Sequence, residues 1–197
     1  MKKKRIIAVL LVLLMLPAFG CRLFDAAQDR YETLITEIRL EKQPPPEILA
    51  LFPDAVSVRK TEIEAADGPY GDGRYGSTYI TRTEIAEDVK GVVVGYAIVV
   101  TNHNAYNPPL TLALGVTPEG VTTGIYFLEM NETPGMGTKA DEPFFKEQFV
   151  GRSVESFTLF GEGADGVDAI SGATVTSRAV LLAVNAALDY YRGNIQK

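Results

Sequence analysis

The segment Asp168-Ala-Ile-Ser-Gly-Ala-Thr-Val-Thr-Ser177 is rich in small and hydroxylated residues and contains one glycine. It lies directly before a long, largely apolar segment. That apolar segment, Arg178 to Tyr191, predicts a helix with one narrow polar stripe. The stripe consists of Arg178, Asn185, Asp189 and Arg192. Thr176 or Ser177 is the expected N-cap, and Gly193 is the expected first residue after the helix.

A helix that begins after such a segment allows two interpretations. Free backbone N–H groups and the helix dipole favour an anion at this end, so the segment could bind a phosphate-like group. A capped helix preceded by a small-residue turn explains the same residues equally well. The residues alone leave both interpretations open.

Upstream of this segment, the pattern is typical of strands joined by short turns. Apolar and β-branched residues predict strands within 78–83, 92–101, 110–114 and 121–127, and a last strand at 157–160. The turn Thr117-Pro-Glu-Gly120 makes a hairpin of the third and fourth strands. Consecutive strands of this kind predict a mostly antiparallel sheet flanked by helices, which is the α+β class.

Helices are predicted before and after these strands in the sequence. Residues 22–42 have helical spacing, and Pro44-Pro-Pro46 ends that helix. A second short helix is expected at 47–52, and Pro, Gly and Asp predict turns over 53–78. Residues 143–149 predict a short amphipathic helix with Phe145 and Phe149 on one face.

The N-terminus is typical of an exported chain. The basic segment Met1-Lys-Lys-Lys-Arg5 precedes uncharged residues 6–20 and then Cys21, the only cysteine. This order predicts a signal or a single membrane anchor. Cys21 after Gly20 resembles the lipobox of bacterial lipoproteins, where the cysteine is lipidated, although the usual leucine three residues earlier is missing. A lipoprotein, an anchored chain and a secreted chain all place residues 22–197 outside the cytoplasm.

Composition excludes several kinds of function. The sequence has 19 basic and 25 acidic residues; without the four basic residues of the signal, 15 basic residues remain against 25 acidic. A balance this negative argues against nucleic acid as a partner. His103 is the only histidine and lies in a polar turn, so neither a zinc site, nor a Ser-His-Asp triad, nor any other protein metal site is expected.

A second segment of interest is Glu132-Thr-Pro-Gly-Met-Gly137. Pro134 and Gly135 suit the two central positions of a type II turn. Gly137 would let the backbone approach a flat or bulky group closely. An ordinary loop at the end of a strand explains the same residues.

Together the two segments resemble a known family. Asp168-Ala-Ile-Ser-Gly-Ala-Thr174 resembles the signature at which FMN is attached covalently to threonine, and Glu132–Gly137 resembles the Glu-Thr-Pro-Gly-Leu-Gly loop of the same domain. This is the FMN-binding domain of the G subunit of the Rnf electron-transport complex and of the C subunit of the sodium-translocating NADH:quinone reductase. The order of elements also agrees, over roughly residues 25–195.

The resemblance implies that FMN is attached to Thr174 through a phosphodiester, a choice that the residue types alone do not make among Thr174, Thr176 and Ser177. It implies further cofactor contacts from Glu132, Thr133, Pro134, Gly135, Met136, Gly137, Ser171, Gly172, Ala173 and Thr176. Met136 replaces the family's leucine, which conserves volume. The chain departs from the family at Met130, often histidine there, and at Ala105-Tyr-Asn-Pro108, commonly Gly-Tyr-Gly-Gly.

The family also implies a partner enzyme. A separate flavin transferase, which uses FAD and a divalent metal, would recognise the segment that carries the acceptor. In this chain those residues are Asp168, Ser171, Gly172, Ala173 and Thr174. The protein itself would be the substrate of that reaction and has no evident catalytic residue of its own.

These expectations define three regions: a signal or anchor with Cys21 over 1–21, N-terminal helices over 22–53, and an FMN-binding domain over 54–197. The expected function is that of an electron carrier at the extracytoplasmic face of a bacterial cell membrane, as one component of an Rnf-type ion-translocating complex. One alternative is a stand-alone flavinylated lipoprotein for extracellular electron transfer. Another is a flavin-free binding or sensory module of the same fold, because fold alone does not fix function.

Overall fold

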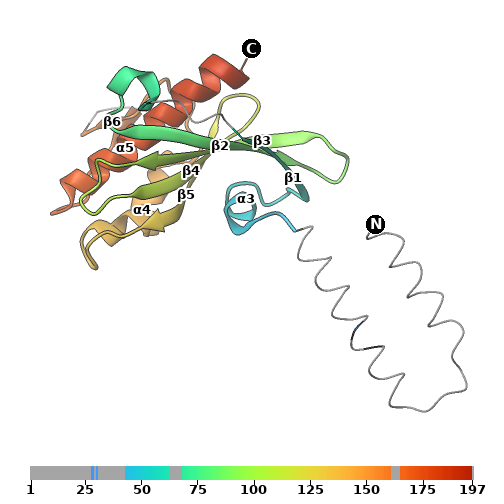
Figure 1. Ribbon diagram of the computed structural model, residues 1–197, viewed down its shortest axis with the longest axis horizontal. Coiled ribbons are helices and arrows are strands. Elements are labelled where there is room, and N and C mark those ends of the chain that lie inside the picture. The colour runs from blue at the N-terminus through green and yellow to red at the C-terminus, as the bar shows by residue number, and fades with distance from the viewer. Residues whose placement is uncertain (1–27, 29, 31–42, 63–67, 161–164, 197) are drawn as a thin grey trace, which may run out of the picture. The chain divides into compact units, whose positions relative to one another are not determined.

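The computed structural model describes residues 28, 30, 43–62, 68–160 and 165–196 (Figure 1). The chain divides into two compact units, Met1–Gln43 and Pro44–Lys197. The predicted signal and Cys21 lie outside the described residues, as does nearly all of the predicted helix over 22–42. None of the helices in the described ranges has both the length and the apolar character needed to cross a bilayer.

The second unit is built on a five-stranded sheet in the order β1-β2-β3-β4-β5, with every neighbouring pair antiparallel. Its strands are β1 (Ser57–Glu62), β2 (Thr78–Glu87), β3 (Val93–Asn102), β4 (Leu110–Val116) and β5 (Thr122–Met130). The predicted antiparallel sheet is therefore confirmed. The turn-rich prediction for 53–78 missed β1, whereas the short turn η1 (Tyr70–Gly73) lies where turns were predicted. The polar sequence of β1 suits an edge strand, and it lacks the alternation of apolar and polar residues that identifies a strand from sequence.

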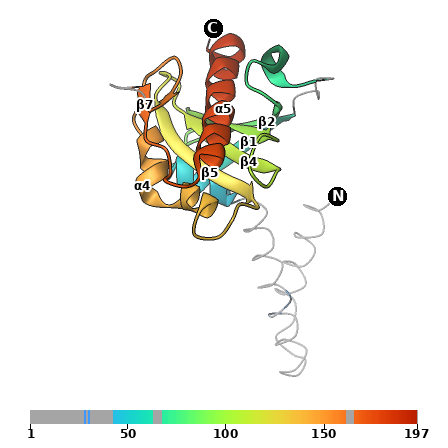
Figure 2. The same ribbon diagram turned by 90° about the vertical axis from the view of Figure 1, so that its left-hand side faces the viewer.

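Helices cover both faces of the sheet (Figures 1 and 2). The long helix α5 (Thr174–Tyr190) lies across one face, and α3 (Pro46–Leu51) packs on the other. Side chains of β3 alternate between these layers: Ile98 and Val100 belong to the α5 core, whereas Ala97 and Val99 belong to the α3 core. This period of two lets one strand serve two cores.

The start of α5 differs from the prediction. The helix begins at Thr174, and Ala173 is its N-cap residue without a side-chain cap. The prediction of Thr176 or Ser177 as N-cap is wrong, because both lie inside the first turn. The Ser177 hydroxyl instead accepts a 2.9 Å hydrogen bond from the Ile170 N–H and donates one of 3.0 Å to the Ala173 carbonyl. It therefore folds the preceding loop back onto the helix.

The end of α5 also differs. The backbone continues as a wider turn, η5 (Tyr191–Ile195), closed by a 2.9 Å hydrogen bond from the Gln196 N–H to the Tyr191 carbonyl. Gly193 lies inside this turn, so its predicted place as the first residue after the helix is wrong. Tyr191, the first residue of this turn, is buried, and its hydroxyl shares its hydrogen between the carbonyls of Thr117 and Pro118, both at 3.0 Å.

The segment between β5 and α5 carries short elements. They are η2 (Gly137–Asp141), α4 (Pro143–Lys146), η3 (Glu147–Phe149), and the parallel two-stranded pair β6 (Thr158–Leu159) and β7 (Gly166–Val167). The predicted amphipathic helix over 143–149 is confirmed as α4 and η3, and Phe145 and Phe149 are fully buried with ring centroids 5.6 Å apart. The predicted strand over 157–160 is reduced to two residues.

Candidate functional site

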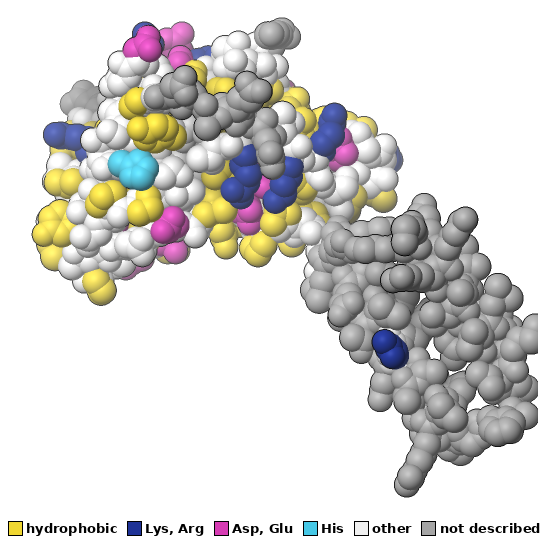
Figure 3. Space-filling model, viewed as in Figure 1, with side chains coloured by type: hydrophobic (Ala, Val, Ile, Leu, Met, Phe, Trp, Pro, Cys, Tyr) yellow, Lys and Arg dark blue, Asp and Glu magenta, His cyan; other side chains and the backbone are white. Residues whose placement is uncertain are grey.

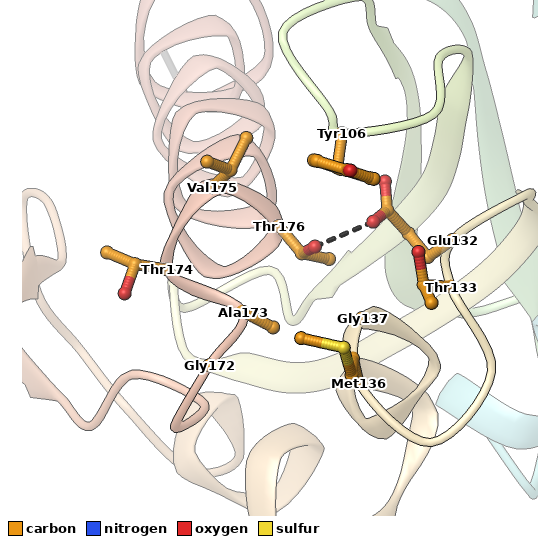
Figure 4. A pocket seen from close by; sticks show the side chains of 10 residues that line it. All are labelled: Tyr106, Glu132, Thr133, Met136, Gly137, Gly172, Ala173, Thr174, Val175 and Thr176. Atoms are coloured by element: carbon orange, nitrogen blue, oxygen red, sulfur yellow. Dashed lines mark hydrogen bonds between the residues drawn. The ribbon is translucent and has the colours of Figure 1, made fainter.

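A pocket of about 400 Å³ lies at the N-terminal end of α5. Two segments that are far apart in the sequence face each other across it, the loop after β5 and the start of α5 (Figure 4). The lining residues are Tyr106, Glu132, Thr133, Met136, Gly137, Gly172, Ala173, Thr174, Val175 and Thr176. The fold thus brings together the two segments in which the sequence predicted binding residues.

Glu132 holds the walls of this pocket together. It follows the end of β5, and only 4% of its surface is exposed. Its Oε2 atom accepts a 2.7 Å hydrogen bond from the Thr176 hydroxyl, and Oε1 accepts one of 3.1 Å from the Asn107 N–H. One carboxylate therefore joins the loop after β5, the loop between β3 and β4, and the first turn of α5.

The loop after Glu132 folds as the sequence predicted. Gly135 has a φ of +72°, as the third residue of a type II turn requires, and the Met136 N–H donates a 3.1 Å hydrogen bond to the Thr133 carbonyl. The Gly135 N–H donates to the Thr138 hydroxyl at 3.0 Å. This turn directs Met136 toward Gly172 and Ala173, so its thioether forms one side of the pocket (Figure 4).

The absence of a side chain at Gly137 lets two side chains of the protein itself, Glu132 and Thr176, lie close to its backbone. A Cβ atom here would lie 2.5 Å from Glu132 Oε2 and 2.8 Å from Thr176 Oγ1. Any larger residue would therefore press on the hydrogen-bonded pair. The expected role of Gly137 beside a flat group is thus accompanied by a steric role inside the protein.

The start of α5 presents an exposed hydroxyl and free donors. Thr174 is exposed, whereas Thr176 is 1% exposed and Ser177 is fully buried. Figure 4 shows the Thr174 side chain on the outer side of the helix, directed away from the Thr176–Glu132 pair. In the part of the chain that the structure describes, the backbone N–H groups of Thr174, Val175 and Thr176 have no hydrogen-bond partner. They are the donors that a helix N-terminus offers to an anion.

Some predicted residues lie outside the pocket lining. These are Pro134, Gly135, Ser171 and Asp168. Asp168 is exposed, and Gln148 holds its backbone: the Asp168 N–H donates to Gln148 Oε1 at 2.7 Å, and Gln148 Nε2 donates to the Asp168 carbonyl at 3.3 Å. Pro134 and Gly135 shape the turn that positions Met136.

Two lining residues, Tyr106 and Val175, were not among the predicted contacts. Tyr106 is 64% exposed and Val175 is also exposed, so both present apolar surface at the pocket mouth. The sequence signal that could have identified Tyr106 was the segment Ala105-Tyr-Asn-Pro108, which retains only the tyrosine of the family's Gly-Tyr-Gly-Gly. Asn107 next to it bonds Glu132, which fixes the loop beside the pocket.

Metal-ligating side chains do not gather at this pocket. No group of three His, Cys, Asp or Glu residues within the described ranges is placed to hold a metal ion. His103, predicted to be a solvated turn residue, is exposed (Figure 3, cyan) and lies edge-on to Tyr79 with ring centroids 5.6 Å apart.

The residues present fit a flavin mononucleotide. Ligand pockets of about 300–1,000 Å³ with apolar walls and a few polar groups are typical of small-molecule sites. Here Tyr106, Met136 and Val175 supply surface for a flat ring. The amides of the first turn of α5 supply donors for a phosphate. The glycine at 172 leaves room, because a Cβ there would meet only the Met136 methyl group, at 3.6 Å.

Comparison with known proteins agrees with this fit. Residues 105–189 match the FMN-binding domain family. The chain is 37% identical over 112 residues to the G subunit of the Na(+)-translocating ferredoxin:NAD(+) oxidoreductase complex of Acetobacterium woodii, covering 54% of this chain and 53% of that one. It is 33% identical over 138 residues to the C subunit of the Na(+)-translocating NADH-quinone reductase of Neisseria meningitidis, covering 64% and 51%. The chain spans about half the length of these curated relatives.

A solved structure shows the same fold. NqrC of Shewanella oneidensis superposes with a TM-score of 0.54 at 21% identity, covering 72% of this chain and 70% of that one. Both predicted segments, 132–137 and 168–174, fall inside the matched range of the domain family. Residues 105–189 are therefore similar to the FMN-binding domain, and the chain resembles the G subunit of Rnf-type complexes and the C subunit of the sodium-translocating NADH-quinone reductase.

Proposed function

We propose that this protein is an electron carrier that holds FMN covalently on Thr174, as one component of an Rnf-type ion-translocating oxidoreductase complex. One observation carries the attachment: of the three hydroxyl residues that begin α5, only Thr174 is exposed. Thr176 and Ser177 are buried and hydrogen-bonded inside the protein. A modifying enzyme can therefore reach the Thr174 hydroxyl without unfolding the helix.

The attachment is a phosphoryl transfer from FAD, catalysed by a separate transferase with a divalent metal. The Thr174 oxygen forms a bond to the phosphorus on the FMN side of the pyrophosphate, the pyrophosphate bond breaks, and AMP leaves. The hydroxyl proton passes to a base of the transferase. The exposed residues Asp168, Ser171 and Gly172, with Ala173, form the segment that the enzyme recognises, and small side chains here let it approach.

Once attached, the flavin supplies the electron chemistry, and the protein supplies orientation and electrostatics. The free amides at the start of α5 bind the phosphate. Met136 and Tyr106 pack against the ring, and Glu132 holds the loops that carry them. No side chain of this protein needs to act as an acid, a base or a nucleophile in the transfer of electrons.

The test is co-expression of the full chain with a flavin transferase, followed by a denaturing gel viewed under ultraviolet light. Wild type should show a fluorescent band, and Thr174→Val should show none. Thr81→Val, an exposed threonine on β2, is the matched control and should fluoresce like wild type. A wild type without fluorescence contradicts covalent flavin, and a fluorescent Thr174→Val contradicts the choice of acceptor.

Membrane attachment at the extracytoplasmic face is the second part of the proposal. The basic and apolar residues before Cys21 support it, as do the Na(+)-translocating enzymes named for the relatives. The position of Cys21 after Gly20 also supports the alternative of a stand-alone flavinylated lipoprotein for extracellular electron transfer. Purification from its native membrane separates these: co-purifying membrane and iron–sulfur subunits support the complex, and a flavoprotein recovered alone supports the carrier.

The anchor itself has a direct test. Mass analysis of the mature N-terminus should find a lipid-modified Cys21 as the first residue if the chain is a lipoprotein. A mature chain that retains any residue before Cys21 rules this out, and one that retains all of residues 1–20 supports a single N-terminal helix as the anchor.

A further inference from the structure

Glu132 is a buried carboxylate in the pocket wall, and no basic side chain in the described part of the chain forms an ion pair with it. On the face shown in Figure 3, several basic and acidic side chains lie next to each other. Two other buried carboxylates do have cations beside them: Glu84 has Lys60 Nζ at 3.1 Å and Arg82 Nε at 2.9 Å, and Glu47 has Arg82 Nη2 at 3.2 Å. Among the described residues, Glu132 takes part in no ion pair.

The hydrogen bonds to Glu132 fix its charge in place and leave the net charge unchanged. Its two oxygens accept from one backbone N–H and one hydroxyl, at 3.1 and 2.7 Å, and both donors are neutral. Burying an unpaired charge is unfavourable even when it is hydrogen-bonded. A glutamine could accept from Asn107 and donate to Thr176, so the pocket geometry by itself does not require the charge.

We propose that Glu132 lowers the reduction potential of the flavin bound in this pocket. The inference rests on the proposed function, because it needs FMN at this site. Full reduction of the flavin takes two electrons from a low-potential donor protein, with a proton from solvent, and so adds negative charge to the ring. A fixed anion in the same wall destabilises the reduced form more than the oxidised form, and the low dielectric of a buried site strengthens this effect.

The magnitude follows from Coulomb's law. With an effective dielectric constant of about 20 and a separation on the order of 10 Å, one charge changes the equilibrium between oxidised and reduced flavin by about tenfold. For a two-electron couple, tenfold corresponds to about 30 mV. Removing the charge should therefore raise the midpoint potential by about this amount or more.

The experiment is a spectroelectrochemical titration of the full-length flavinylated protein and four variants. Glu132→Gln removes the charge and keeps the shape, and Glu132→Asp keeps the charge. Glu129→Gln makes the same change in net charge at an exposed position of β5. Thr176→Val keeps the carboxylate but removes the hydroxyl that partly offsets its field.

We expect a raised potential in Glu132→Gln, a potential close to wild type in Glu132→Asp and Glu129→Gln, and a value at or below wild type in Thr176→Val. A Glu132→Gln protein with the wild-type potential overturns the inference while leaving the flavin assignment intact. A raised potential in Thr176→Val also overturns the inference, because loss of structure rather than loss of charge would then set the potential. If Glu132→Gln does not fold, the potential of Thr176→Val alone decides between these two explanations. A wild type that takes up no flavin overturns the proposed function together with the inference.

Discussion

The hydroxyl of Thr176 donates a 2.7 Å hydrogen bond to Oε2 of Glu132, and both side chains are buried. The two residues are 44 positions apart in the sequence. Glu132 belongs to one of the two segments that resemble the FMN-binding domain, and Thr176 lies two residues after the other, Asp168–Thr174. This contact is what makes one pocket out of two loops, because Glu132 also holds Asn107 and Gly137 lies directly against the pair.

Thr176→Val should destabilise the protein. The substitution conserves volume but leaves one oxygen of a buried carboxylate without its donor, which is unfavourable by about 1–3 kcal/mol. Urea denaturation measures the change in the free energy of unfolding. Thr61→Val, at an exposed position of the edge strand β1, is the control and should change it by less than about 0.5 kcal/mol. Equal effects in the two variants would contradict a structural role for the Thr176–Glu132 contact.

Gly137→Ala should also destabilise the protein, by about 1–3 kcal/mol, because the new methyl group overlaps Glu132 and Thr176. Gly193→Ala is the matched control, since a Cβ there meets nothing within 4 Å. Thermal unfolding of both variants, without flavin, isolates the steric effect from cofactor binding. A Gly137→Ala protein as stable as Gly193→Ala would contradict the steric role of Gly137, because the loop after β5 would then accommodate the methyl group without loss of stability.

The phenylalanines after η2 offer a third comparison. The Phe149 ring packs between Phe145 and Phe157, with centroids 5.6 and 5.1 Å away, whereas Phe144 is 53% exposed. Phe149→Ala should therefore lower the free energy of unfolding by about 3–5 kcal/mol. Phe144→Ala should lower it by less than about 1 kcal/mol. Chemical denaturation of the two variants side by side checks this, and similar losses would contradict the assigned core.

Alkaline pH should destabilise the domain through Tyr70. Burial, followed by the neighbouring Asp189 carboxylate, raises the pKa of Tyr70 well above its usual value of 10.0, and its hydroxyl donates to Asp189 Oδ2 at 3.1 Å. Because the folded-state pKa is the higher one, the stabilisation is fully present below pH 10 and is lost as the pH rises above it. Tyr70→Phe should be less stable near neutral pH and should lose less stability between pH 9 and pH 11, measured by denaturation across that range. Parallel curves for variant and wild type would contradict the assignment.

Much of the fold could be predicted from the sequence because its signals are local. The β-branched residues within 92–101 indicated a strand, alternation on both sides of Thr117–Gly120 indicated the hairpin of β4 and β5, and Pro134-Gly135 indicated the type II turn. β1 was missed because an exposed edge strand carries polar residues on both sides of its alternation. The start of α5 was misplaced because a serine hydroxyl near a helix start can either cap the helix or bond the preceding loop. Only the folded loop shows that the Ser177 hydroxyl accepts a hydrogen bond from the Ile170 N–H rather than capping the helix.

The candidate site was predictable in its parts but not in its arrangement. The sequence identified both segments, yet nothing local indicated that Glu132 and Thr176 meet, since that contact depends on where β5 ends relative to the first turn of α5. The choice among Thr174, Thr176 and Ser177 likewise depends on burial, which is a property of the packed helix. Tyr106 lines the pocket next to Asn107, whose backbone N–H donates to Glu132, and this long-range contact is likewise not visible in the local sequence.

Mass spectrometry of the tryptic peptide Ser153–Arg178, from the full chain co-expressed with a flavin transferase, tests the central claim most directly. This peptide contains Ser171, Thr174, Thr176 and Ser177, so fragmentation locates any modification among its hydroxyl groups. We predict a mass increase equal to FMN minus one water, carried by Thr174. An unmodified peptide, or the same increase on Thr176 or Ser177, would contradict covalent attachment at Thr174.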